Sequence, residues 1–290
     1  MTLPTQLTCP PPPVADTRIT FPRPHVLLVT LDRPKSLNAI PSSQHLALAN
    51  VWNWYDSQPY LRCAVLTGSG RAFCAGADLK EWDTRNSNAG DSSSKQAEGG
   101  TATSWTPEGF GGLSNRLGKK PIVAAVNGLC YGGGMEMAIN CDLVIADGQK
   151  AKFGLPEVTK GVVALAGALP RLIRTVGRQR AGEMALLGRI GYSPQQMKEW
   201  GLVNFTTAEG QDVVEEALKL AEEVAGNSPD AVLVSREGLR LGWEGGVGPV
   251  LATEIVERGI YGRIDKGENM REGTRSFVEK RKPKWVDSKL

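Results

Sequence analysis

The stretch that most constrains the fold of this chain runs from Pro121 to Ala146. Its first apolar run, Ile122 to Val126, is rich in β-branched residues and predicts a buried strand. Three consecutive glycines, Gly132 to Gly134, follow and lead into MEMAIN, which is typical of a helix start. A second apolar run, Leu143 to Ala146, predicts the next strand. This order of strand, glycine turn, helix and strand indicates an α/β fold.

The glycine turn has three possible interpretations. Glycines let a helix lie close to a sheet, which would make the turn a packing feature. Free N–H groups at a helix start can bind phosphate, but neither glycine-rich phosphate-binding motif is present. The third interpretation is an oxyanion hole, in which backbone N–H groups stabilise charge on a carbonyl oxygen. Residues 64–80 favour the third, because they predict another strand, glycine turn and small-residue loop that can supply a second N–H group.

Three motifs together resemble the enoyl-CoA hydratase/isomerase family, the crotonase superfamily. They are AFCAGADLK at 72–80, AAVNGLCYGGGMEMAINCDLVIA at 124–146 and KFGLPE at 152–157. LDRPKSLNA near the start and FVEKRKP near the end match the same family, so the resemblance covers about residues 21–285. It implies an α/β fold, a crotonase-like spiral of ββα units, with a C-terminal helical extension that forms trimers.

By this resemblance, the N–H groups of Ala77 and Gly133 form an oxyanion hole for a thioester carbonyl. Glu136 and Glu157 match the two acid/base glutamates of the hydratases, one activating water at C3 and the other moving the proton at C2. Two carboxylates in a partly dry pocket should raise at least one pKa. Many isomerases of the family lack one of these glutamates, so the presence of both favours hydration or dehydration.

The resemblance also assigns residues that bind the substrate outside the reacting atoms. These are Lys35, Ala75, Asp78, Leu79 and Lys80. For any single lysine, a solvated surface charge is an equal alternative. One departure from the family is Leu165, which replaces a glycine whose backbone helps to hold the catalytic water. We therefore expect the acyl pocket to differ in shape and specificity from that of common hydratases.

The chain divides into three parts. Residues 1–20 contain a proline run with little periodicity and predict a disordered N-terminal tail. Residues 21–226 form the predicted α/β core, within which 83–108 is rich in Ser, Gly, Thr and Asn and predicts a mobile loop. Helical segments are predicted at 166–176, 179–187, 194–200 and 211–226. Residues 227–290 form the predicted C-terminal helical extension.

Composition excludes several classes of protein. Apolar content of 41% and charged content of 22% are ordinary for a soluble globular protein, and a net charge of +3 is too small to imply a nucleic-acid partner. No apolar run is long enough to span a membrane, and the N-terminal residues do not have the apolar segment expected of a signal peptide. Five scattered cysteines without a C-x-x-C pair indicate neither a zinc site nor a disulfide framework. We expect no metal, and no cofactor apart from the coenzyme A of the substrate.

The sequence ends in Ser288-Lys289-Leu290, which matches an address read by the peroxisomal import receptor. We expect a peroxisomal protein and expect this tripeptide to make no contacts with the core. The other expected partners are an acyl-CoA thioester and further copies of the chain, in a homotrimer or in a hexamer built as a dimer of trimers.

The leading functional hypothesis is an enoyl-CoA hydratase, or 3-hydroxyacyl-CoA dehydratase, acting on a short or branched acyl-CoA. The resemblance extends to peroxisomal fungal enzymes, including those of siderophore biosynthesis that dehydrate mevalonyl-CoA. A Δ3,Δ2-enoyl-CoA isomerase using one glutamate is the closest alternative. A non-catalytic family member that binds RNA is an alternative of another class, and the basic segment 171–180 is its one candidate surface.

Overall fold

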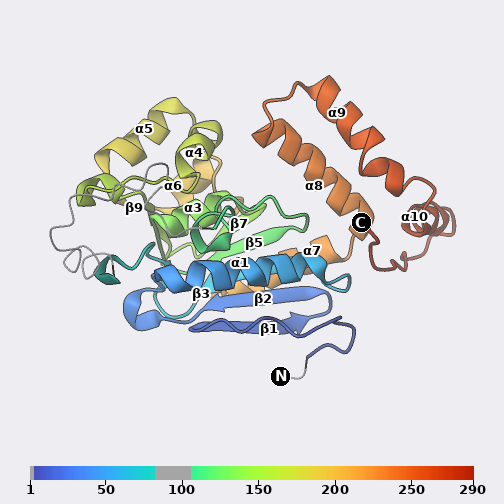
Figure 1. Cartoon of the computed structure of the whole chain (residues 1–290), viewed down its shortest axis with the longest axis horizontal. Coiled ribbons are helices and arrows are strands. Elements are labelled where there is room, and N and C mark those ends of the chain that lie inside the picture. The colour runs from blue at the N-terminus through green and yellow to red at the C-terminus, as the bar shows by residue number, and fades with distance from the viewer. Residues whose placement is uncertain (1–2, 82–105) are drawn as a thin grey trace, which may run out of the picture.

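The structure is a computed structural model that describes residues 3–81 and 106–290 of the chain. Its larger sheet has six strands in the order β1-β2-β3-β5-β7-β10 (Figure 1). Their bounds are Thr17–Arg23 for β1, Val26–Leu31 for β2, Cys63–Gly68 for β3, Ile122–Val126 for β5, Leu143–Ala146 for β7 and Phe205–Thr206 for β10. β1 and β2 are antiparallel, and the other neighbouring pairs are parallel.

A smaller sheet of four strands stands beside the first. Its strands are β4 (Ala72–Cys74), β6 (Leu129–Tyr131), β8 (Lys152–Gly154) and β9 (Ile190–Tyr192), in that spatial order. β4, β6 and β8 are parallel, whereas β9 is antiparallel to β8. Because the carboxyl ends of parallel strands meet at one edge of a sheet, the loops after β4, β6 and β8 lie together.

The central strands of the larger sheet are buried on both faces. All six residues of β3 and all five of β5 are buried. Successive side chains point to opposite faces, so Ala64 and Leu66 join the main core with α1 (Ser42–Ser57). Cys63 and Val65 belong to a second cluster with α7 (Val213–Ala225). Continuous apolar runs of this kind are typical of parallel strands that are covered on both sides.

The other helices of the core are short. They are α3 (Gly133–Ile139), α4 (Ala168–Val176), α5 (Arg178–Leu187) and α6 (Pro194–Glu199), with 3-10 helices η1 (Pro34–Ser36), η2 (Phe110–Gly112) and η3 (Glu157–Lys160). The helices predicted at 166–176, 179–187 and 194–200 agree with α4, α5 and α6, and the one predicted at 211–226 agrees with α7.

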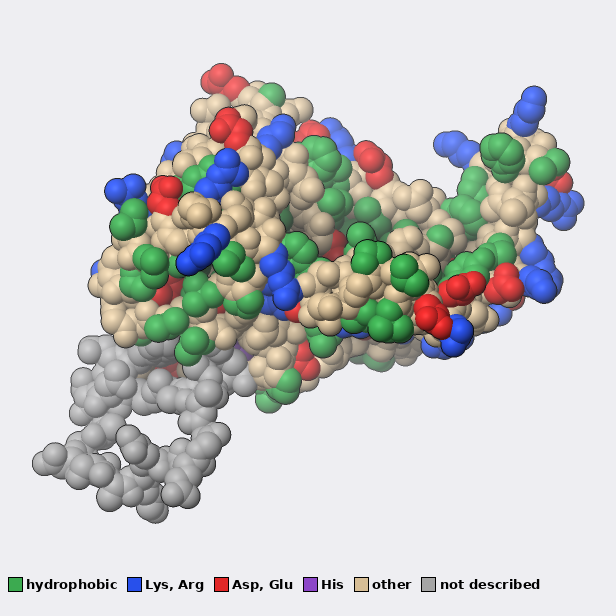
Figure 2. Space-filling model, turned by 90° about the horizontal axis from the view of Figure 1, so that it is seen from above, with side chains coloured by type: hydrophobic (Ala, Val, Ile, Leu, Met, Phe, Trp, Pro, Cys, Tyr) green, Lys and Arg blue, Asp and Glu red, His purple; other side chains and the backbone are tan. Residues whose placement is uncertain are grey.

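A C-terminal arm leaves the core after α7. It consists of α8 (Pro229–Glu244), α9 (Pro249–Arg258), η4 (Tyr261–Arg263) and α10 (Glu268–Val278). Figure 1 shows these helices, orange to red, standing away from the strands, while the C-terminal end returns to the base of α8. Hydrophobic side chains lie on the surface of the arm (Figure 2), among them Leu239, Val250 and Phe277, which are 76%, 84% and 85% exposed.

The N-terminal residues differ from the expectation of a disordered tail over residues 1–20. Residues 17–20 belong to β1, and the described residues before them pack along α1. The Trp54 indole N–H donates to Cys9 O at 3.0 Å, and the Thr8 N–H donates to Gln58 Oε1 at 2.8 Å. Leu7 also packs against the main core. The proline run predicted disorder because it lacks periodicity, but these contacts come from a partner helix and leave no local pattern.

Most of the loop predicted at 83–108 lies outside the described residues, which resume at Thr106. Within the described part of the chain, no helix is long and apolar enough to cross a membrane.

Candidate active site

Three loops meet at the carboxyl edge of the smaller sheet. The β4–β6 register pairs Cys74 with Cys130, and the β6–β8 register pairs Tyr131 with Gly154. Just beyond these pairs, the Gly132 N–H donates to Gly154 O at 3.1 Å. The loops that follow the three strands are thereby held side by side, and residues from all three line one cavity of about 80 Å³.

At each of the three positions after β6, a different steric constraint favours glycine. Gly132 has a φ of +56°, a backbone conformation that favours glycine. A Cβ on Gly133 would lie 2.6 Å from the ring of Phe110, and a Cβ on Gly134 would lie 2.2 Å from Cys74 O. The turn is therefore packed closely against Phe110 and Cys74, which confirms the close approach of helix and sheet. It also brings the start of α3 directly against the loop after β4.

The two predicted oxyanion donors lie on neighbouring loops. The Ile40 N–H donates to Gly76 O at 2.9 Å, and Ile40 O accepts from the Asp78 N–H at 3.2 Å. Because alternate N–H groups of an extended segment point in opposite directions, the N–H of the intervening Ala77 points away from Ile40. Gly133 is the first residue of α3, where N–H groups have no partner within the helix. Within residues 3–81 and 106–290, neither the Ala77 N–H nor the Gly133 N–H has a hydrogen-bond acceptor.

Glu136 lies in the first turn of α3 and is 3% exposed. Its Oε1 accepts from the N–H groups of Ala166 at 2.8 Å and Ala168 at 3.2 Å. Burial raises the pKa of Glu136 to about 7, and the nearby Glu157 adds to this, while the N–H donors and Arg171 oppose it. A carboxyl group with a pKa near neutrality can both take up and release a proton, as general acid–base catalysis requires.

Glu157 begins η3 directly after Pro156 and lines the same cavity. Its Oε1 is 3.4 Å from the position of a Cβ built on Gly132, so the carboxylate lies over the glycine turn. Burial raises the pKa of Glu157 as well. Its Oε2 is buried and has no hydrogen-bond partner in the described part of the chain. Since buried polar atoms normally have a partner, this oxygen is available to a group of the substrate.

Comparison with known proteins identifies the family. The model of the enoyl-CoA hydratase/isomerase family matches residues 23–288, which is nearly the whole chain. The chain belongs to this family.

Two relatives are similar to this chain over almost the full length of both proteins. A mevalonyl-coenzyme A hydratase of Beauveria bassiana is 60% identical over 97% of this chain and 98% of its own. A mevalonyl-coenzyme A hydratase of Aspergillus fumigatus is 45% identical over 96% of this chain and 98% of its own.

Solved structures of the hydratase/isomerase family share the fold. An enoyl-CoA hydratase from Mycobacterium tuberculosis has a TM-score of 0.80 at 29% identity, covering 94% of this chain and 99% of that one. A probable enoyl-CoA hydratase/isomerase from Mycobacterium abscessus has a TM-score of 0.79 at 34% identity, covering 93% and 98%. These similarities confirm the predicted crotonase-like α/β fold and its C-terminal helical region.

The cavity of this hydratase/isomerase family member brings together six predicted site residues: Ala75, Ala77, Leu79, Gly133, Glu136 and Glu157. Within the described residues, the other three do not line it. Asp78 forms an ion pair with Arg33 at 3.1 Å and thereby fixes the loop after β4. Lys35 and Lys80 are exposed on segments that flank this loop. The segment that contains Lys35 is held against the loop after β4, because Leu37 O accepts from the Ala75 N–H at 3.0 Å.

The Leu165 side chain does not form part of the cavity wall. Its side chain is 63% exposed, and the cavity lining in the described residues does not include it. The backbone just after Leu165 holds Glu136 instead, through the two N–H groups of Ala166 and Ala168. The effect of this departure on substrate choice stays a prediction.

Two functional features were missed from the sequence. The Phe110 ring lines one side of the cavity and packs edge-to-face with the buried His45 ring at a centroid distance of 4.7 Å. His45 Nδ1 accepts from the Gly111 N–H at 2.9 Å, which fixes η2 against α1. Phe110 follows the segment 83–108, and nothing in the local sequence predicts that its ring reaches Gly133.

Arg171 is the second feature, and it was assigned to a candidate RNA-binding segment. Its guanidinium is buried instead, donating to Ser114 O at 2.6 Å, to Asn115 Oδ1 at 2.8 Å and to Glu244 Oε1 at 2.8 Å. At 5% exposure it is unavailable to a nucleic acid. It links α8 to the start of α4, whose N–H groups hold Glu136.

No group of three or more His, Cys, Asp or Glu side chains is placed to bind a metal ion within residues 3–81 and 106–290.

Proposed function

We propose that this chain is an enoyl-CoA hydratase that adds water to a 2-enoyl-CoA, or removes it from a 3-hydroxyacyl-CoA. The observation that carries the proposal is the cavity in which Glu136 and Glu157 converge beside the free N–H groups of Ala77 and Gly133. Such N–H groups stabilise the charge that develops on a thioester oxygen, and losing one typically costs about 10²–10³ in rate. Two carboxyl groups with raised pKa values supply the acid and the base.

In the dehydration direction, the thioester oxygen accepts hydrogen bonds from Ala77 and Gly133 as the proton at C2 leaves. One glutamate takes this proton, and the other gives a proton to the hydroxyl at C3, which departs as water. The reverse sequence hydrates the double bond. Because both carboxyl groups face one cavity of about 80 Å³, the water and the proton are handled within the same cavity.

We propose mevalonyl-CoA as the substrate, within siderophore biosynthesis. This rests on the relatives that are 60% and 45% identical, both named mevalonyl-coenzyme A hydratases. Mevalonyl-CoA carries its hydroxyl and a methyl group on C3, so loss of water gives a branched enoyl thioester. The chemistry needs no group beyond the two carboxyls and the two N–H donors.

The test is a panel of thioesters supplied to the purified protein. It includes mevalonyl-CoA, an unbranched 3-hydroxyacyl-CoA and a 3-enoyl-CoA, with products separated by liquid chromatography and identified by mass. We expect loss of water from mevalonyl-CoA at the highest kcat/KM. Conversion of the 3-enoyl-CoA without any hydration or dehydration would favour the Δ3,Δ2-enoyl-CoA isomerase alternative. Binding of RNA without turnover of any thioester would favour a non-catalytic family member.

We also propose that the arm joins copies of the chain in a homotrimer, or in a hexamer built from two trimers. The exposed apolar side chains of Leu239, Val250 and Phe277 support this, because contiguous apolar surface on a soluble protein commonly indicates an interface. We propose a peroxisomal location through Ser288-Lys289-Leu290 and its import receptor.

A further inference from the structure

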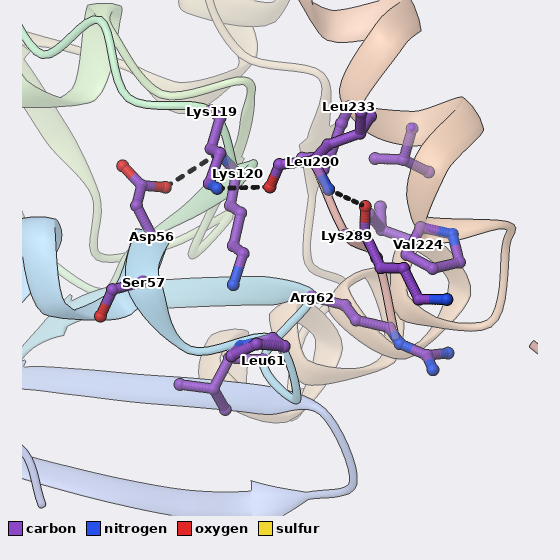
Figure 3. Close-up of a pocket in the computed structure, with 14 residues that line it drawn as sticks. Asp56, Ser57, Leu61, Arg62, Lys119, Lys120, Val224, Leu233, Lys289 and Leu290 are labelled. Atoms are coloured by element: carbon purple, nitrogen blue, oxygen red, sulfur yellow. Dashed lines mark hydrogen bonds between the residues drawn. The ribbon is translucent and has the colours of Figure 1, made fainter. Parts of the chain in front are cut away.

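A second cavity, of about 200 Å³, shares no residue with the catalytic one. Its walls come from residues 56–62 at the end of α1 and just after it, from Lys119 and Lys120 before β5, and from α7 and α8 (Figure 3). The remaining wall is the C-terminal tripeptide, Ser288 to Leu290. We call this cavity, together with Asp230 and Glu268 of the neighbouring pocket, the C-terminal groove. The last residues of the chain therefore form part of its lining.

Each residue of the tripeptide has a polar partner on the folded protein. Leu290 O accepts from Lys119 Nζ at 2.6 Å (Figure 3). The Ser288 hydroxyl donates to the Asp230 carboxylate and accepts from the Leu290 N–H at 3.2 Å. The Lys289 ammonium pairs with Glu268 at 2.7 Å. Lys119 precedes β5 of the core, so the expectation that this tripeptide makes no contacts with the core was wrong.

The residues before the tripeptide are held more firmly. Asn269 is 2% exposed, and its side chain exchanges two hydrogen bonds with the backbone of Val286, at 3.0 and 3.1 Å. The Trp285 indole N–H donates to Gly226 O at 2.9 Å. Arg62, whose side chain is 9% exposed, pairs with Asp287 at 3.1 Å. These contacts bring the tripeptide to the groove whether or not its own contacts are formed.

We propose that the C-terminal groove is a docking surface for Ser288–Leu290 that competes with the import receptor for the same residues. The inference rests on the peroxisomal address proposed above. A receptor that binds a tripeptide must contact its side chains and its backbone. While the tripeptide lies in the C-terminal groove, these groups are bound instead by Asp230, Glu268 and Lys119. The receptor therefore binds only the fraction of molecules in which the tripeptide is released, and its apparent affinity falls by that fraction.

The contacts of the tripeptide are suited to reversible release. Lys119 and Lys289 are exposed, so the hydrogen bond of Lys119 to Leu290 and the ion pair of Lys289 with Glu268 are weak and are screened by salt. Release of the tripeptide leaves the Trp285 and Val286 contacts in place, because these use Gly226 and Asn269 instead. Opening is thus confined to the last residues of the chain and does not unfold the arm.

The test measures binding of the full chain to the recombinant tripeptide-binding domain of a peroxisomal import receptor. A free peptide with the sequence of residues 284–290 is measured in parallel, because its tripeptide is always open. We expect the intact protein to bind about fivefold or more weakly than the peptide, since several weak contacts must be released. Lys119→Ala should recover part of this difference, and Lys119→Arg should keep the whole of it.

Lys150→Ala is the matched control, because it removes one exposed lysine charge that makes no contact with the C-terminal groove. It should leave the ratio of the two dissociation constants unchanged. Equal binding of the intact protein and the free peptide would overturn the proposal. So would a ratio that Lys119→Ala leaves unchanged, or one that Lys150→Ala shifts as far as Lys119→Ala does.

A second readout does not involve the receptor. Carboxypeptidase should release Leu290 several-fold faster from Lys119→Ala than from the wild type or from Lys150→Ala, and equal rates would overturn docking in the groove. If the free peptide fails to bind the receptor domain, the peroxisomal address itself is wrong. The competition is then overturned too, while the carboxypeptidase result separates that failure from a failure of the groove.

Discussion

The α/β core and the C-terminal arm bury their side chains in opposite ways. Every residue of β3 and β5 is buried, and the core even encloses a carboxyl group, that of Glu136. By contrast, α8 buries only Pro229 and Leu233 among its sixteen residues. The arm instead leaves Val250 and Phe277 more than four-fifths exposed.

This difference separates two tasks in the molecule. The core excludes water and can therefore hold an acid and a base at raised pKa values, which is what the chemistry needs. The arm buries too little apolar surface to be stabilised by its own contacts, so it needs other surfaces, either the core or further copies of the chain. The core is thus the region for catalysis, and the arm is the region that we propose for assembly.

The largest expected effect lies in the core. Glu136→Gln and Glu157→Gln should each lower the turnover of the proposed substrate, mevalonyl-CoA, by about 10²–10⁴, because each removes one member of the acid/base pair. Stopped assays with purified variants, together with titration of acyl-CoA binding, will separate kcat from affinity, and affinity should change little. Glu254→Gln in α9 is the matched control in the arm, and it should leave turnover unchanged. Wild-type turnover in Glu136→Gln would refute the two-carboxylate mechanism.

The two regions should also respond to pH in opposite directions. Burial raises the pKa of Glu136 to about 7, so between its unfolded value of 4.5 and 7 the folded state binds more protons than the unfolded state. The free energy of unfolding therefore falls as pH rises through this window, by about 3 kcal/mol for a shift of this size. Hydrogen bonds from Arg281, and then from the Lys284 N–H, lower the pKa of Glu272 in the arm to about 2, so its contribution is lost only as pH falls below about 4.5.

Denaturant unfolding of the wild type and of Glu136→Gln at pH 5 and pH 8 tests the first half of this contrast. The variant keeps an amide oxygen that can accept from Ala166 and Ala168, but it has no charge to bury. It should gain stability relative to the wild type at pH 8 and much less at pH 5. A difference that is the same at both pH values would show that burial of the charge at position 136 is not costly.

Substitution of glycine should reveal how tightly each region is packed. Gly133→Val should lower turnover by about 10², because the Phe110 ring would be displaced and the oxyanion donor with it. Gly242→Val in α8 is the matched control, since a Cβ there meets no heavy atom within 4 Å. Melting temperature and assembled mass are measured for both, so that misfolding is distinguished from a damaged site. A well-folded Gly133→Val enzyme of normal turnover would return the glycine turn to a packing role alone.

The smallest of these effects is expected in the arm. Val250→Glu should weaken assembly by about tenfold or more, because a buried apolar side chain contributes about 1.5–3 kcal/mol to an interface. The same change should leave the secondary structure of the core intact. Sedimentation analysis over a range of concentrations measures the first effect, and circular dichroism measures the second. An unchanged association constant would show that this face of α9 lies outside the interface.

The features of the core and the arm that could be predicted from the sequence are those with a local sequence pattern. The apolar runs of β5 and β7 and the spacing of α7 gave the α/β core, and the glycine turn placed Gly133 and Glu136 on one helix start. Long-range contacts left no such pattern. The packing of Phe110 on Gly133 and the docking of Leu290 beside Lys119 depend on residues far apart in the chain.

The order of the three loops along the chain has a consequence for biosynthesis. The loop after β4 is made first, the loop after β6 much later, and Glu157 follows β8. Their alignment requires the β4–β6 and β6–β8 pairings, which are contacts between distant residues and close slowly for that reason. A nascent chain that has not yet reached Lys152 lacks the strand on which Glu157 depends. The nascent chain therefore has no competent site for acyl-CoA thioesters until more than half of the protein has emerged from the ribosome.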